Sequence, residues 1–275
     1  MNRICIRKKI KDIRCFTSSS LSLSLSSSSA SSSAAASPSS VSNHHGIIEI
    51  RTYQAKPELH TDYKNKSTLI APLRKQYMQD KWKLYLQAET GYGTLQDFIH
   101  IYHYEGGLQQ RSDIRKSMAS DSKWNEFLDT SRQCLVQQKS EIFVPVNLKG
   151  IHINYWNDNK NDNGNNPVYE IRHYQLIPGY NVIPNMIDIF SKGLPNKLKC
   201  CPESLGQLIL LAHSDITVLN QFIEIWRYPS QNKALEHRIA SRKATEWRTC
   251  IESAAKLTVT FQNRLMTPLK FSPLQ

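Results

Sequence analysis

One short pattern that combines a carboxylate, a guanidinium group and a phenol occurs twice in the chain. Residues 49–53 read Glu-Ile-Arg-Thr-Tyr, and residues 170–174 read Glu-Ile-Arg-His-Tyr. The alternation is typical of a β-strand and puts the polar side chains of each copy on one face. Such a face can hold an acidic or planar ligand through its arginines, or it can simply pair its own charges.

The pattern belongs to a longer duplication. Residues 98–104 match residues 222–228, and the arginine and tryptophan at positions 115 and 124 recur at positions 238 and 247. All offsets lie between about 121 and 124 residues, so whole structural units are aligned rather than one chance pentapeptide. The chain is therefore a tandem duplication.

Each copy shows the same order of strand-like and helix-like segments. Alternating or β-rich runs at 48–53, 83–89, 98–104 and 142–145 predict four strands, with counterparts beginning at Glu170 and at 207–213, 222–228 and 265–268. Helical segments are predicted over 59–79 and 182–192, and again before the last strand of each copy, with a break and an N-cap at 120–122. The last strand should be a short edge strand, where its proline is tolerated. The order β-α-β-β-α-β is a split βαβ unit, the ferredoxin-like arrangement.

The first 45 residues have a different composition from the rest. They carry six basic residues against one acid, followed by a long Ser/Ala run. This basic, Ser-rich and acid-poor composition predicts a mitochondrial transit peptide, with a disordered Ser-rich leader as the alternative. Residues 150–167 are rich in asparagine and predict a linker between a first repeat at 46–149 and a second at 168–275.

Charge and cysteine usage exclude some functions. The leader accounts for +5 of the formal net charge of +12, and the remaining positive charge is spread over both repeats. Neither repeat contains a recognisable nucleic-acid-binding motif, so we expect no nucleic-acid partner. The six cysteines have no CxxC pairing, and no apolar run is long enough for a transmembrane helix. The chain shows no P-loop, nucleophile elbow, dinucleotide fingerprint or metal-ligand spacing. We therefore predict no catalytic residue, metal or cofactor.

The sequence resembles the NIPSNAP family over both repeats and the terminus, about residues 46–275, and the first repeat departs more from the pattern. The resemblance rests on the opening Tyr-Glu-Ile-Arg-x-Tyr, the Trp-Arg-Tyr at 226–228, the Arg238…Trp247 spacing and the ending at 266–275. It implies an α+β fold of the dimeric α/β-barrel superfamily, with two tandem ferredoxin-like units packed sheet to sheet within one chain. It also implies a mitochondrial protein, in the matrix or membrane-associated, that binds protein partners such as autophagy or trafficking adaptors.

The duplicated polar face is the candidate site. If the isoleucine faces meet the helices, the polar faces line the space between the two sheets and form a polar, aromatic cavity. The alternative is a purely structural role, in which the charges pair across the pseudo-twofold axis that relates the two repeats and fix the register of the sheets. The site residues are Glu49, Arg51, Tyr53, His100, Tyr102, Glu170, Arg172, Tyr174, Glu224 and Trp226.

Two functions follow from these readings. The first is a non-catalytic mitochondrial binding or scaffold protein in quality control, autophagy-adaptor recruitment or vesicle trafficking. The alternative is a small-molecule-binding or monooxygenase-like enzyme that uses the polar face, although fold analogy alone is weak evidence for chemistry.

Overall fold

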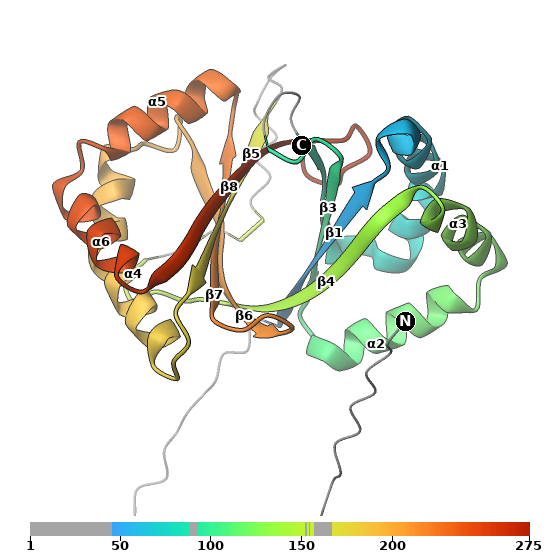
Figure 1. The fold of residues 1–275 in the computed structure, drawn as a ribbon, viewed down its shortest axis with the longest axis horizontal. Helices are drawn as coiled ribbons and strands as arrows, with labels where there is room; N and C mark the ends of the chain where they lie inside the picture. The colour runs from blue at the N-terminus through green and yellow to red at the C-terminus, as the bar shows by residue number, and fades with distance from the viewer. Residues whose placement is uncertain (1–45, 89–92, 152, 154, 157–166) are drawn as a thin grey trace, which may run out of the picture. The chain divides into compact units, whose positions relative to one another are not determined.

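The structure, a computed structural model, describes residues 46–88, 93–151, 153, 155–156 and 167–275. The predicted leader and most of the predicted linker lie outside these residues. The described residues form the two α/β repeats in Figure 1, each with its helices on the outer side of its own sheet.

Both repeats are built from the same series of elements. The first contains β1 (Ile47–Ala55), a 3-10 turn (Pro57–Leu59), α1 (His60–Met78), a second 3-10 turn (Gln79–Lys81), β2 (Trp82–Ala88), β3 (Asp97–Tyr104), α2 (Gly107–Ala119), α3 (Ser122–Arg132) and β4 (Leu135–Pro145). The second contains β5 (Val168–Leu176), α4 (Val182–Cys200), β6 (Gln207–Ile216), β7 (Gln221–Tyr228), α5 (Gln231–Ser241), α6 (Thr245–Ala255) and β8 (Thr258–Pro268). The helix break predicted at 120–122 is confirmed, because Asp121 caps α3 by accepting hydrogen bonds from the backbone N–H groups of Lys123 and Trp124.

The strands close into one eight-stranded barrel. The first repeat contributes the order β4-β1-β3-β2 and the second the order β8-β5-β7-β6, which is the ferredoxin-like arrangement in both. The sheets join where β2 pairs with β8 and β4 pairs with β6, so no strand edge is left open. The predicted fold, two ferredoxin-like units combined into an intrachain α/β barrel, is confirmed.

The prediction that the last strand of each repeat is a short edge strand is wrong. Both β4 and β8 are 11 residues long and have a partner on each side. Each begins next to its own repeat's first strand and reaches the other repeat only near its end, at Pro145 and Pro268. Periodicity finds only the buried end of such a strand, because the first half is exposed and mixes polar with apolar residues.

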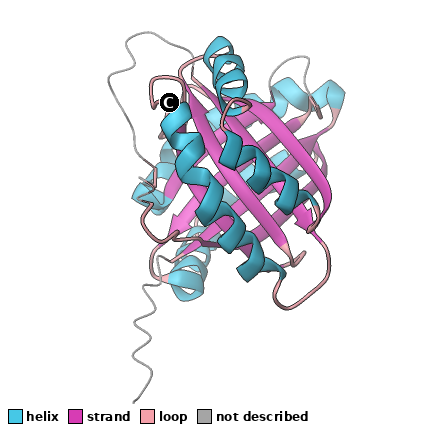
Figure 2. Ribbon diagram, turned by 90° about the vertical axis from the view of Figure 1, so that its left-hand side faces the viewer, coloured by secondary structure: helices cyan, strands magenta, loops and turns pink. Residues whose placement is uncertain are grey.

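The side chains of each sheet divide between two layers. Apolar residues of both repeats meet inside the barrel, where Ile48, Ile50, Ile171 and Ile225 belong to one buried cluster. Each of the two other clusters lies between one sheet and the helices of the same repeat. Figure 2 shows helices covering the strands. Both faces of each sheet are therefore covered.

The beginning of the predicted linker is part of the core. Trp156 is only 9% exposed and packs with the cluster inside the barrel. Its indole Nε1 donates a hydrogen bond to Nδ1 of His103 on β3, at 3.2 Å. The predicted linker is therefore packed into the core at Trp156, while residues 157–166 lie outside the described part of the chain.

Candidate functional site

The duplicated polar faces lie between the sheets and the helices, not between the two sheets. Tyr53 packs in the helix-side cluster of the first repeat, and Tyr174 in that of the second. The adjacent isoleucines point into the barrel instead. The predicted inter-sheet placement is therefore wrong. Its physical reason is that the core of the barrel is filled by apolar residues of both repeats, whereas α2 and α5 supply arginines that neutralise the glutamates.

In the first repeat, Glu49 is fully buried and lies at the centre of a hydrogen-bond cluster. Three arginines, one tyrosine and one serine donate to its carboxylate: Arg51 (3.1 Å), Arg111 (2.7 Å), Arg115 (2.9 Å), Tyr104 (3.2 Å) and Ser140 (2.7 Å). Arg51 also donates from Nε to the hydroxyl of Tyr53, at 2.6 Å. Three guanidinium groups thus share one carboxylate.

In the second repeat, Glu170 is equally buried but has fewer cationic partners. Its donors are Arg172 (3.1 Å), Arg238 (2.7 Å), Tyr228 (2.8 Å) and Asn263 (3.0 Å). All four come from β5, β7, β8 or α5 of the same repeat. The charges therefore pair within each repeat, between sheet and helix, and not across the pseudo-twofold axis as the alternative interpretation predicted.

Both central glutamates are held ionised. Burial alone raises the pKa of Glu170, but the charges of Arg172 and Arg238 and the hydrogen bonds it accepts outweigh burial and lower its pKa to about 2. The same opposition, with Arg115, Arg111 and Arg51 as the cations, holds the pKa of Glu49 well below its usual range. Neither carboxylate exchanges a proton near neutral pH.

A second polar centre lies deeper under the helix that follows the first strand of each repeat. In the second repeat Lys197 of α4 is fully buried, 3.4 Å from Glu224 and over the rings of Trp226 and Trp247. Burial lowers the pKa of Lys197 to about 8, against the opposing charge of Glu224. The hydroxyl of Tyr174 donates to Glu224 at 2.6 Å.

The first repeat has a different arrangement at the equivalent positions. Arg74 of α1 is 2% exposed and contacts Nδ1 of His100 and the hydroxyl of Tyr102, each at 2.7 Å. Burial, followed by the charge of Arg74, lowers the pKa of His100 well below its usual range, so the ring stays neutral and can accept a hydrogen bond. A neutral acceptor thus occupies the place that a carboxylate takes in the second repeat.

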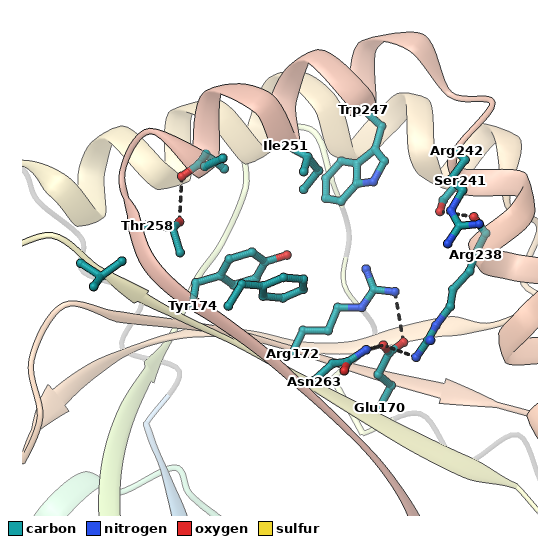
Figure 3. A pocket seen from close by; sticks show the side chains of 14 residues that line it. Glu170, Arg172, Tyr174, Arg238, Ser241, Arg242, Trp247, Ile251, Thr258 and Asn263 are labelled. Carbon is teal, nitrogen blue, oxygen red and sulfur yellow. Dashed lines mark hydrogen bonds and ion pairs between the residues drawn. The ribbon is translucent and has the colours of Figure 1, made fainter. Parts of the chain in front are cut away.

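A cavity of about 500 Å³ opens beside Glu170, between α5, α6 and the strands β5 and β8. Figure 3 shows its two ends: Arg172, Arg238 and Arg242 lie on one side, whereas Tyr174 and Thr258 lie on the other, with Trp247 and Ile251 above. The remaining lining residues are Glu170, Ser241, Ala254, Ala255, Val259, Phe261 and Asn263. The cavity is therefore cationic at one end and apolar or aromatic at the other.

The guanidinium group of Arg172 has donors left for a ligand. One of its terminal nitrogens binds Glu170, but its Nε is buried and has no hydrogen-bond partner. Arg242 is exposed and has no ion pair among the described residues. Three arginines face one carboxylate in this cavity, which leaves an excess of positive charge.

The sequence prediction found the strand residues of both clusters and missed the helical ones. The structure joins Glu49, Arg51 and Tyr53 by hydrogen bonds and brings each of the other seven site residues to the helix side of its own sheet. The sequence prediction did not assign Arg111, Arg115, Arg238 or Lys197 to the site. A signal existed at Arg115 and Arg238, which recur at the offset of the duplication and are therefore paired positions.

Two observations on the described residues bear on other classes of function. They contain no group of three or more His, Cys, Asp or Glu side chains arranged to hold a metal ion. None of their helices is both long and apolar enough to cross a membrane.

The NIPSNAP family model matches residues 48–148 and 169–273, one match for each repeat. The chain is 24% identical over 191 residues to human NipSnap homolog 2, covering 68% of this chain and 60% of that protein. It is 25% identical over 230 residues to human NipSnap homolog 3A, covering 82% of this chain and 85% of that one. A proposed monooxygenase from Fusobacterium nucleatum has the same fold at 14% identity, with a TM-score of 0.56 over 82% of this chain and 92% of its own.

Proposed function

Because this chain belongs to the NIPSNAP family, and because its second repeat contains a cationic and aromatic cavity, we propose that it is a non-catalytic mitochondrial binding protein whose ligand is a small amphipathic anion. The ligand's carboxylate, sulfonate or phosphate group contacts Arg172 and Arg242. Its apolar part lies against Trp247 and Phe261.

The observation that carries this proposal is the position of Arg172. Its side chain is only 11% exposed and lines the cavity, yet its Nε has no acceptor among the described residues. An unpartnered buried donor is unfavourable by about 1–3 kcal/mol, and more when the group is charged. The Nε atom itself has almost no accessible surface, so an anionic ligand meets Arg172 at the terminal nitrogen that points into the cavity in Figure 3, and the excess of arginines over carboxylates in the lining supplies the favourable charge.

Binding fits the protonation states of the cavity better than catalysis does. Acid–base catalysis uses a group whose pKa lies near the working pH. The pKa of Glu170 is lowered to about 2, and burial raises the pKa of Tyr174 well above its usual range. The monooxygenase-like alternative would use the same cavity, but the likeness to the Fusobacterium nucleatum protein is a likeness of fold alone.

The cellular part of the proposal is a mitochondrial scaffold in quality control, autophagy-adaptor recruitment or vesicle trafficking. The composition of residues 1–45 supports the location, and the family resemblance supports the protein partners. Deleting residues 1–45 should move the protein to the cytosol without unfolding the two repeats. A truncated protein that still fractionates with mitochondria would refute the transit-peptide prediction.

The ligand class is tested with two fluorescent probes of similar shape, 1-anilinonaphthalene-8-sulfonate and its neutral analogue N-phenyl-1-naphthylamine. We expect the full-length chain to bind the sulfonate saturably and at least about tenfold more tightly than the neutral probe, a difference of about 1.4 kcal/mol. Equal affinities, or no saturable binding by the folded chain, would refute the proposal.

A matched pair of variants locates the binding site. Arg242→Gln removes a cation from the cavity wall without leaving a partner unpaired, and should weaken sulfonate binding. Lys243→Gln removes the same charge from the next residue, which is exposed and does not line the cavity, and should have little effect. An equal loss in both variants would point to a general charge effect and against this cavity.

A further inference from the structure

The interior of the barrel is closed at one end. The described part of the linker covers this end through Trp156, which contacts His103 near the start of β1. The last residue of the chain lies here too, because the backbone oxygen of Gln275 accepts hydrogen bonds from the hydroxyl of Tyr169 and from Nε of Arg227. The apolar residues behind this cover are fully buried; Ile225, for example, is 0% exposed.

The opposite end contains a cavity of about 330 Å³ that is separate from the proposed anion site. Its floor is purely apolar and consists of side chains from both repeats that are 2–7% exposed: Ile50, Ile99, Phe143, Ile171 and Ile223. Because strands of both repeats line it, this cavity exists only when the two sheets close into a barrel.

The rim of this cavity carries charges of both signs. Glu141 on β4 and Arg264 on β8 occupy equivalent positions in the two repeats, 123 residues apart, so the duplication has placed opposite charges at related sites. Arg264 is 3.3 Å from Asp97, and Gln221 approaches Glu141 only at 3.5 Å. The rim is therefore dipolar across the pseudo-twofold axis.

One further charged group on the rim is free to meet a ligand. Lys139 lies two residues before Glu141 on β4, is exposed and takes part in no ion pair within the described ranges. A ligand head group can therefore meet an anionic side chain and cationic side chains on the same rim.

We propose that this cavity binds a small zwitterion with an aliphatic chain, the chemistry of a free aliphatic α-amino acid. The aliphatic chain occupies the isoleucine-rich floor. The ammonium group contacts Glu141, and the carboxylate contacts Lys139 and Arg264. A volume of about 330 Å³ is at the lower end of small-molecule sites, which matches a ligand of this size. A ligand with a single charge would satisfy only one side of the rim.

The test uses nuclear magnetic resonance of the full chain with labelled isoleucine methyl groups. Four isoleucines line the floor, whereas Ile225 lies in the barrel core outside this cavity and is the internal reference. The probe is L-norleucine, compared with hexanoate, which lacks the ammonium group, and pentylamine, which lacks the carboxylate. We expect norleucine to shift the floor methyl groups saturably and each analogue to bind at least about tenfold more weakly.

Glu141→Gln should weaken norleucine binding but leave hexanoate binding unchanged or stronger. Glu252→Gln, an exposed position on α6, is the matched control and should bind norleucine as the unaltered chain does. Absence of floor-methyl shifts with norleucine would overturn the proposal. So would hexanoate or pentylamine binding as tightly as norleucine, or a loss of binding in both variants.

Discussion

Replacing Glu170 by glutamine tests whether the duplicated carboxylate is held in place by ion pairing. Glu170→Gln keeps the size of the side chain but leaves Arg172 and Arg238 without their common counterion. Folding lowers the pKa of Glu170 from an ordinary value of 4.5 to about 2. This lowering corresponds to about 3 kcal/mol of stabilisation of the folded state at neutral pH. The side chain is 0% exposed, so solvent screens this interaction little.

The pH dependence has a definite sign. Because folding lowers the pKa of Glu170, the stabilisation is fully present above about pH 4.5 and is lost as the pH falls towards 2. The free energy of unfolding of Glu170→Gln should therefore be about 3 kcal/mol below that of the unaltered chain at pH 7, and about 1.4 kcal/mol below it at pH 3. Glu49 titrates equally in both proteins, so the difference reports Glu170.

Urea unfolding of the full chain at both pH values, followed by far-ultraviolet circular dichroism, measures this difference. Glu236→Gln is the control, because its carboxylate is half exposed and, among the described residues, pairs only with Lys233 on the surface. It should change stability by less than about 0.5 kcal/mol. The reasoning fails if Glu170→Gln loses less than about 1 kcal/mol at pH 7, or if its deficit is the same at pH 3.

Three further predictions concern stability. Lys197→Met should destabilise the chain by about 3–5 kcal/mol because it removes the ion-pair partner of the buried Glu224 and leaves only the charge of Arg172 to oppose burial, and adding Glu224→Gln should recover much of the loss in a double-mutant cycle. Gly193→Ala should lower the melting temperature, because the new Cβ would lie 2.2 Å from Cβ of Cys250 and such overpacking destabilises a protein by about 1–3 kcal/mol. An unchanged melting temperature would show that α4 and α6 separate easily. Asp121→Ala should cost about 1 kcal/mol through loss of the α3 cap, whereas Asp121→Asn should retain most of it in chemical unfolding.

The duplication made most of the fold predictable. The alternating runs around Glu49 and Glu170 gave the strands, and their repetition at a constant offset gave two units of the same kind. What the alternation did not determine is the direction of each face. The polar face of a strand can line a space between the two sheets or lie under a layer of helices. The alternation of polar and apolar residues along the strand is the same in both cases.

The missed site residues have a related cause. Arg115 and Arg238 lie on helices with mostly polar surfaces, so their sequence context resembles that of ordinary exposed arginines. Only the three-dimensional packing brings them within 3 Å of buried carboxylates. The cavity beside Arg172 was likewise outside the reach of sequence, because it depends on how far α5 and α6 stand from β8.

Native mass spectrometry of the processed protein isolated gently from its own cells tests the central claim, that the second repeat binds a small amphipathic anion. The account predicts a retained small molecule that is anionic after release and is lost or reduced in Arg242→Gln but not in Lys243→Gln. A retained molecule that is neutral or cationic, or a chain that stays unliganded even after incubation with 1-anilinonaphthalene-8-sulfonate, would contradict it.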